Sequence, residues 1–83
     1  MAWLKGGHLW VVEAKSLTDS NEEQQLRLGL GQVLRYRNLL RPHFDIVTAV
    51  LAVERKPSDL TWTNLCEELG VVLVWPGTLN RLR

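Results

Sequence analysis

A nearly continuous apolar segment in the middle of the chain constrains the fold more than any other feature. Residues 45–54 read DIVTAVLAVE and are rich in β-branched side chains. A run of this kind is typical of a central strand that is covered on both faces, because a half-exposed strand alternates apolar and polar residues. We therefore expect this segment to lie in the middle of a sheet.

Further strands are predicted on either side of this segment. Residues 8–15, HLWVVEAK, read as a strand, and the Lys-Gly-Gly sequence at 5–7 is a hairpin-type turn before it. Residues 1–4 would then be the remnant of an antiparallel partner, too short to be a full strand. Residues 71–75 should form another buried strand, which the Pro-Gly pair at 76–77 stops.

Two helices should connect these strands. The longer is predicted over about 21–40, because Pro42 stops it and because Ser20 and Glu23 have the spacing of a capping box. The shorter is predicted over roughly 61–69, with a glycine directly after it. The tail, residues 78–83, is expected to be a last turn or a frayed end.

Strand, helix, strand, helix and strand in this order require right-handed crossovers and a largely parallel sheet. The predicted fold class is therefore α/β, with a small, mixed, largely parallel sheet flanked by helices. With 83 residues the chain should form a single domain, and its 46% hydrophobic and 23% charged residues exclude wholesale disorder.

The chain has a single cysteine, Cys66, and therefore no internal disulfide and no thiol-ligated metal site of its own. A lone thiol fits a reducing compartment, and we expect the protein to be cytoplasmic. The first residues lack the long apolar region of a signal peptide, and the apolar runs are too short to cross a bilayer. The net charge of +1 does not by itself indicate a nucleic-acid partner.

The strand at 8–15 carries two charged residues, Glu13 and Lys15, which alternation places on the same face. A carboxylate can hold Mg²⁺ together with waters and phosphate oxygens, and a lysine two residues on can orient or deprotonate a metal-bound water. A strand that desolvates both charges usually uses them. The alternative interpretation of this E-x-K pair is a solvated strand face or an edge salt bridge.

The predicted long helix carries two adjacent stripes at helical spacing. A mostly apolar stripe should face the core: Leu26, Leu30, Val33, Arg37 and Leu40. The stripe beside it is polar: Gln25, Gly29, Gln32 and Tyr36. Gly29 and Gly31 each cost a helix about 1 kcal/mol relative to alanine, which indicates close packing on the sheet or close approach of a ligand.

The sequence Glu13-Ala14-Lys15 on a strand, followed by Gln32 and Tyr36 on a helix, resembles the PD-(D/E)xK nuclease superfamily with its restriction-endonuclease-like fold. The E-x-K segment matches the strand half-motif of that family. The helical segment QVLRY, residues 32–36, matches the Q-x-x-x-Y motif of its RecB-like branch. The resemblance covers residues 9 to about 75.

The resemblance implies metal-dependent hydrolysis of DNA phosphodiester bonds, by an endonuclease or an exonuclease. Glu13 and the backbone carbonyl of Ala14 would bind Mg²⁺ or Mn²⁺, and Lys15 would assist the attacking water. Gln32 and Tyr36 would line the active site or contact the DNA backbone. The candidate catalytic residues are thus Glu13, Lys15, Gln32 and Tyr36.

The chain departs from the family pattern at one position. The family places a catalytic Asp on the strand before E-x-K, whereas no acidic residue precedes Glu13 here. With one carboxylate, Mg²⁺ binding should be weak. Three explanations stay open: the sequence is a fragment of a longer protein, another subunit or residue supplies the carboxylate, or the domain is inactive. The nearest acidic candidates are Asp19, Glu22 and Glu23, of which Glu23 is better explained as a helix cap.

The candidate contacts to DNA phosphates are Arg27, Arg35, Arg41 and Gln25, for which a solvated helix face is the alternative explanation. Trp3 is the best candidate for an exposed aromatic at an interface or against a base. The remaining tryptophans are expected in the core or at an interface: Trp10, Trp62 and Trp75.

Three functions compete. The first is a metal-dependent DNA nuclease, the second a catalytically inactive nuclease-fold module for DNA binding or protein assembly, and the third a purely structural domain. A homodimer or higher homo-oligomer is expected, because the few residues before Leu9 should leave a sheet edge and an apolar face exposed. Two subunits would also pair active sites for double-strand cleavage. No membrane partner is expected.

Overall fold

The computed structural model describes residues 1–78 of the 83-residue chain. Its strands are β1 (Ala2–Lys5), β2 (His8–Lys15), β3 (Ile46–Val53) and β4 (Val71–Val74). Its helices are α1 (Glu22–Leu40), a short 3₁₀ turn (Arg41–His43) and α2 (Thr61–Glu68). None of the helices in this part of the chain combines the length and the apolarity needed to cross a bilayer. The predicted tail, apart from Thr78, lies outside the described residues.

The four strands form one sheet in the order β1-β2-β3-β4. β1 and β2 are antiparallel, and the turn between them uses Gly6 and Gly7 at φ angles of 56° and 87°, which glycine adopts without strain. β2, β3 and β4 run parallel, with Val11 beside Ala49 and Ala49 beside Val71. The predicted α/β class with a mixed, mostly parallel sheet is therefore confirmed.

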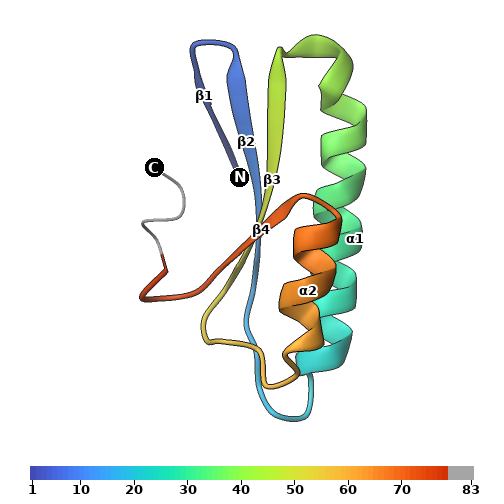
Figure 1. Ribbon diagram of the computed structural model, residues 1–83, viewed down its shortest axis with the longest axis vertical. Helices are drawn as coiled ribbons and strands as arrows, with labels where there is room; N and C mark the ends of the chain where they lie inside the picture. The colour runs from blue at the N-terminus through green and yellow to red at the C-terminus, as the bar shows by residue number, and fades with distance from the viewer. Residues whose placement is uncertain (79–83) are drawn as a thin grey trace.

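Both helices lie on the same face of the sheet (Figure 1). The chain steps in one direction from β2 to β3 to β4, and crossovers of one hand then place their helices on one side. Leu26 and Val33 of α1 and Cys66 of α2 pack there in one core with Val11 and Leu51. The mostly apolar stripe of α1 is thus the buried one, as predicted.

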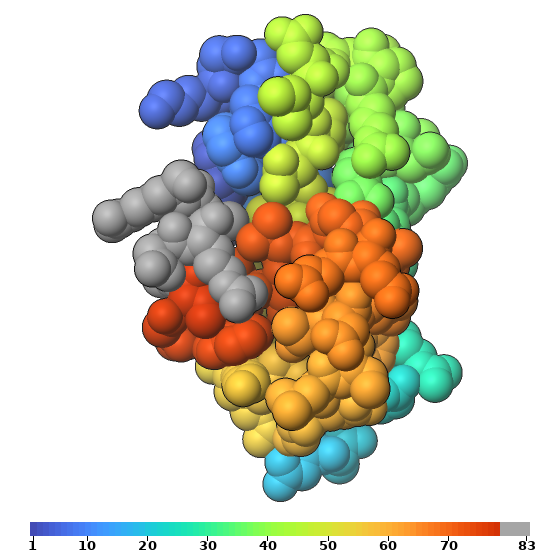
Figure 2. Space-filling view, in the orientation of Figure 1, coloured from blue at the N-terminus to red at the C-terminus, as the bar shows by residue number. Residues whose placement is uncertain are grey.

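β3 is mostly buried on its helix-facing side, whereas on its other side only Val50 is buried and Ile46 is 56% exposed, so the predicted cover of both faces is only partly present. Leu51 is 0% exposed on the helix side, and Val50 is 1% exposed on the other side. Helices cover only one of these two faces within residues 1–78, which the sequence pattern alone does not reveal. In the space-filling view, the β1–β2 hairpin and the end of α1 form the upper half of the molecule, and α2 covers the lower half (Figure 2).

The start of α1 differs from the predicted capping box, which is wrong. The N-cap is Asn21 rather than Ser20, so that Glu23 is one position too early to reach back. Its carboxylate instead pairs with Arg27 one turn on, with 2.6 Å between Oε2 and Nε. The turn before the helix is closed by Thr18, whose N–H donates to Asn21 Oδ1 at 2.7 Å and whose hydroxyl accepts from the Asn21 N–H at 3.2 Å.

Arg37 is the one charged member of the buried stripe, and it ties α1 to the end of α2. Its Nη1 donates to the carbonyl oxygens of Leu69 and Gly70, at 2.9 and 3.2 Å, which supplies partners for the C-terminal end of α2. Burial and, secondly, the charge of Arg41 lower the pKa of Arg37. Its charge therefore serves the packing of the two helices.

Cys66 is a core residue, as predicted. Its side chain is 1% exposed in the cluster between α2 and the sheet. Burial raises the pKa of this thiol, because the thiolate would lose its hydration. A buried, protonated thiol is a poor nucleophile, and Cys66 is therefore no candidate for catalysis.

Candidate functional site

Glu13 and Lys15 form an ion pair on the helix-facing side of β2. Lys15 Nζ lies 3.4 Å from Glu13 Oε1, and the two side chains are only 15% and 19% exposed, Lys15 being the more buried. The predicted alternation is correct, since Val11 on the same face belongs to the core. Of the two alternatives, the solvated strand face is wrong, because α1 covers the pair, whereas the edge salt bridge is what the structure shows.

Gly29 brings the backbone of α1 close to this pair. A Cβ at this position would lie 2.7 Å from Leu51 Cδ1 and 2.9 Å from Lys15 Cγ, both far inside van der Waals contact. The absence of a side chain thus allows the helix to approach β2 and β3. By contrast, a Cβ at Gly31 would meet nothing within 4 Å. The two glycines predicted to share one role therefore differ, and only Gly29 is required for packing.

Gln32 lies one turn beyond Gly29 on the same side of α1. The crossover helix α1 runs antiparallel to β2. Going from Gly29 to Gln32 therefore moves about 4.5 Å along the helix axis in the same direction as going back from Lys15 to Glu13, which is about 6.6 Å along the strand. Gln32 is half-buried, and its Oε1 is a buried acceptor with no hydrogen-bond partner in the described chain. Native proteins rarely leave such an oxygen unsatisfied without a reason.

Tyr36 is placed differently from the other candidate catalytic residues. It lies a further turn along α1 and is 46% exposed. With Gln32 it lines a shallow hollow of about 380 Å³ on the surface of α1, which Arg27 and Arg35 also line. The structure therefore groups Tyr36 with the candidate phosphate-binding arginines, and Glu13 with Lys15.

The backbone of Ala14 faces an edge of the sheet with which no strand of residues 1–78 pairs. The pairing of β1 with β2 ends at Ala2 opposite Val11, and beyond it both backbone groups of Val12 bond to Met1, at 2.8 and 3.2 Å. Backbone groups alternate sides along a strand, so the N–H and C=O of Ala14 point the same way as those of Val12, past the end of β1. If the β1–β2 register were extended, the residue opposite Glu13 would be the one directly before Met1.

A second hollow, of about 310 Å³, lies where β2 and β3 end. It is lined by residues 14–16 and 52–54, with Lys15 among them. The Glu54 carboxylate accepts the N–H of Leu17 at 2.8 Å and so fixes the loop that follows β2. Ligands of open parallel sheets bind outside the carboxyl ends of the strands, which is where this hollow lies.

The other acidic candidates are engaged away from Glu13. Arg55 Nη2 lies 2.9 Å from Asp19 Oδ1 and 3.4 Å from Glu22 Oε1. Glu22 is 9% exposed, and its Oε2 also accepts the N–H groups of Ser58 at 2.9 Å and Asp59 at 3.4 Å. This cluster joins the loop before α1 to the loop before α2. Sequence reasoning missed it, because Glu22 and Arg55 are 33 positions apart.

No group of three or more His, Cys, Asp or Glu side chains within residues 1–78 is arranged to hold a metal ion. The oxygen donors near the E-x-K segment suit a hard cation such as Mg²⁺ in kind: a carboxylate, a backbone carbonyl and an amide. They fall short in number, by at least one carboxylate. A magnesium site built on Glu13 would therefore need a further carboxylate.

The candidate DNA-binding residues have different partners. Arg27 is paired with Glu23, whereas Arg35 donates to the neutral Asn38 Oδ1 at 3.1 Å. Arg41 is exposed just after α1. Gln25 is half-buried, and its Nε2 donates to the Ser16 carbonyl at 3.4 Å, so it connects α1 to the loop after β2.

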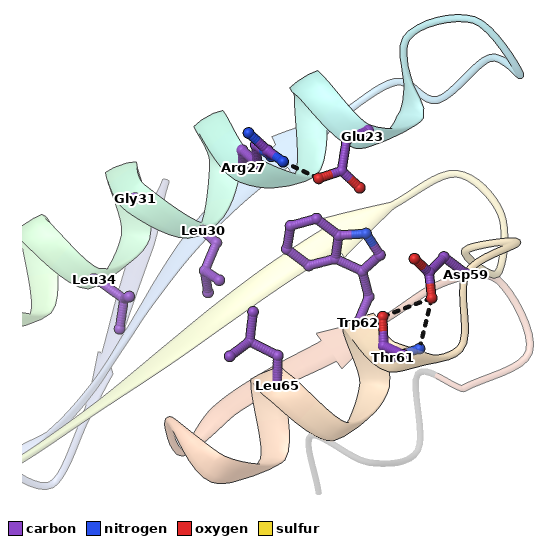
Figure 3. A pocket seen from close by; sticks show the side chains of 9 residues that line it. All are labelled: Glu23, Arg27, Leu30, Gly31, Leu34, Asp59, Thr61, Trp62 and Leu65. Carbon is purple, nitrogen blue, oxygen red and sulfur yellow. Dashed lines mark hydrogen bonds and ion pairs between the residues drawn. The ribbon is translucent and has the colours of Figure 1, made fainter.

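A larger groove, of about 610 Å³, separates α1 from α2 (Figure 3). The indole of Trp62 and the side chains of Leu30, Leu34 and Leu65 line it, and the Glu23–Arg27 ion pair lies at its rim. Asp59, at the same rim, accepts from Thr61 Oγ1 and from the Thr61 N–H, which lowers the pKa of Asp59. This groove carries neither a nucleophile nor a ligand set, and we do not regard it as the site of chemistry.

Comparison with known proteins identifies no relative: no protein-family model, no curated protein and no solved structure matches the chain.

Proposed function

We propose that this chain is a metal-dependent DNA nuclease of the PD-(D/E)xK type that carries half of its metal site. The observation that carries the proposal is the Glu13–Lys15 pair, nearly buried beneath α1 at the open edge of β2. The order of elements adds support, since an antiparallel strand precedes the pair and a helix bearing Gln32 and Tyr36 follows it. These are the features on which the resemblance to that superfamily rests.

Each residue has a defined chemical role in this proposal. The Glu13 carboxylate and the Ala14 carbonyl are the oxygen ligands for Mg²⁺ or Mn²⁺. When bound, the ion supplies a Lewis acid that lowers the pKa of a coordinated water and stabilises charge on the phosphate. Lys15, as an ammonium, orients the attacking water and neutralises the charge that develops on the phosphate. The Gln32 Oε1, which lacks a hydrogen-bond partner in the described chain, orients that water by accepting a hydrogen bond from it.

A second carboxylate is required from outside the described residues. We propose that another copy of the chain supplies it, because within residues 1–78 no strand pairs with the edge of β2 at 13–15 and all four residues of β1 are exposed. A homodimer would also place two sites on one DNA molecule. Light scattering at micromolar concentration should therefore give more than one chain's mass, and a monomeric mass would contradict this part of the proposal.

The buried free thiol of Cys66 is consistent with the reducing cytoplasm as the place of action.

A specific observation favours a second candidate function, a catalytically inactive DNA-binding module of the same fold. The Glu13–Lys15 contact neutralises both charges without a metal. In this case the module binds DNA through Arg35 and Arg41 and hydrolyses nothing.

Cleavage assays separate the two candidates. Wild-type protein should cut DNA with Mg²⁺ or Mn²⁺, and Glu13→Gln or Lys15→Met should each reduce the rate by about 100-fold or more. Glu67→Gln and Lys56→Met change exposed residues of the same types and serve as matched controls that keep the rate. DNA binding without cleavage by either metal would favour the inactive module, and no binding even at low salt would contradict both.

A further inference from the structure

Three aromatic rings are stacked on the face of the sheet that the helices leave uncovered. The ring centroids of Trp3 and Trp10 are 5.3 Å apart with 10° between their planes. The centroids of His8 and Trp10 are 3.6 Å apart with 13° between planes. Trp3 pairs directly with Trp10 across β1 and β2, and His8 is two residues before Trp10, so all three share one face. That face lies opposite Leu9 and Val11, which belong to the core beneath the helices.

The stack is held in place at one end and open at the other. His8 Nε2 lies 2.7 Å from Thr48 Oγ1 on the neighbouring strand, which fixes the imidazole. Trp10 is half-buried between its neighbours, whereas Trp3 is 38% exposed. A flat apolar ring is thus presented to the outside in a fixed orientation, so little conformational entropy is lost when another ring stacks on it.

The charges on this face are positive. Lys5 is exposed and lies opposite His8, and the N-terminal ammonium of Met1 bonds to the carbonyl of Val12 at the same edge. None of the strand residues that point to this face, on β1 to β4, is acidic. Asp45 lies at the hairpin end beside Gly7, off the strands. Aromatic rings bordered by cations suit a ligand that combines flat rings with negative charge.

We propose that Trp3, backed by Trp10, forms a stacking platform for an unpaired base of single-stranded DNA, with Lys5 beside the phosphates of that strand. The inference rests on the proposed function for its choice of DNA, and it names the form of that DNA. Bases stack on aromatic side chains regardless of sequence, because every base has a π-face. In a duplex those faces are already covered by neighbouring base pairs, so the platform selects unpaired nucleotides.

The position of the platform relative to Glu13 also favours a single strand. Trp10 and Glu13 are three residues apart on β2, about 10 Å, but their side chains are on opposite faces. On the described residues 1–78, a nucleic acid that contacts both must pass around the edge of β2 beyond its pairing with β1. A flexible single strand can make that turn within this distance, whereas a duplex is stiff over about 150 base pairs.

A cross-strand tryptophan pair also stabilises a hairpin, so the test must measure binding and stability separately. The probe is a fluorescein-labelled oligothymidylate of about ten nucleotides, compared by anisotropy in EDTA with an abasic oligomer of equal length and with a duplex. Wild-type protein should bind the oligothymidylate at least about tenfold more tightly than the abasic oligomer or the duplex.

Three variants sharpen the test, each checked for folding by circular dichroism. Trp3→Leu keeps apolar area but removes the ring, and should weaken oligothymidylate binding by about 5- to 100-fold without changing abasic binding. Trp3→Phe keeps a ring and should retain most of the affinity. Leu4→Ala, on the same strand but the opposite face, is the matched control and should bind as wild type.

Two outcomes would overturn the platform: abasic oligomer or duplex bound as tightly as oligothymidylate, or unchanged binding in a folded Trp3→Leu variant. Neither outcome depends on cleavage. Glu13→Gln should abolish hydrolysis while leaving oligothymidylate binding intact, so failure of the platform and failure of the nuclease proposal are seen in different measurements.

Discussion

Two partly buried pairs of a carboxylate and a cation lie in this small domain, and they differ in how fully the carboxylate is satisfied. Glu22 accepts two backbone N–H groups in addition to the guanidinium of Arg55. Glu13, whose side chain is 19% exposed, has Lys15 as its one ion-pair or hydrogen-bond partner among the described residues. A saturated carboxylate that joins two loops serves the structure, whereas an unsaturated one beside a lysine is available for chemistry.

The largest expected difference between the two pairs is in stability. The double variant Glu22→Leu/Arg55→Met leaves the N–H groups of Ser58 and Asp59 without an acceptor, and should lower the free energy of unfolding by about 2–3 kcal/mol. The double variant Glu13→Gln/Lys15→Met removes a pair with no such backbone partners, and should be neutral or slightly stabilising. Urea denaturation of both variants measures the difference.

An equally large loss of unfolding free energy in Glu13→Gln/Lys15→Met would contradict this difference between the two pairs, because it would show that the E-x-K pair is itself a structural ion pair. For a domain of this size, a loss of 1 kcal/mol corresponds to a Tm decrease of about 4–8 °C, so thermal unfolding should separate the two variants clearly.

A smaller effect is expected at the two glycines of α1. In Gly29→Ala the new Cβ would overlap Leu51 and Lys15, and the strain should outweigh the gain in helix propensity by about 1 kcal/mol. Gly31→Ala adds its methyl to open space and should stabilise by about 0.5–1 kcal/mol. Equal shifts in the denaturation midpoint for the two variants would contradict the close approach of α1 to the pair.

The smallest effect concerns the arginines, and it distinguishes phosphate contacts from a solvated helix face. Arg35 and Arg41 form no ion pair within residues 1–78, whereas Arg27 is held by Glu23. Arg35→Gln and Arg41→Gln should each reduce the slope of log K against log salt for single-stranded DNA by about 0.7, and Arg27→Gln by less. Slopes unchanged from wild type would assign these arginines to the solvated helix face.

Most of the fold follows from local sequence patterns. The strand at 8–15, the helix that ends before Pro42 and the buried run that becomes β3 are each determined by composition and spacing over a few residues. The hairpin glycines also indicated an antiparallel partner for β2, but β1 is a strand of four residues where only a remnant was expected. The helix cap was mispredicted because Asn21 and Thr18 bond to each other, and several residues in that turn have side chains able to cap a helix.

The candidate site is less accessible to sequence reasoning, since it depends on contacts between distant segments. The sequence places Glu13 and Lys15 on one face, but their burial depends on Gly29 of α1. The different environments of Gly29 and Gly31 depend on the rotation of α1 about its axis, which spacing alone does not fix. Likewise, the stack of Trp3, Trp10 and His8 requires the register of the hairpin.

The central claim is that Glu13 and the Ala14 carbonyl form half of a metal site that needs a carboxylate on the opposing strand. An Asp added directly before Met1 would continue the β1 register and lie opposite Glu13, on the same face of the sheet. An Asp added one position earlier, with Ala before Met1, would point to the other face and is the matched control.

Mn²⁺ binding to these two extended proteins, measured by electron paramagnetic resonance, is the most direct test. The in-register Asp should bind Mn²⁺ at least about tenfold more tightly than the offset Asp, and Glu13→Gln should remove the gain. Equal Mn²⁺ affinity of the two proteins would contradict the half-site.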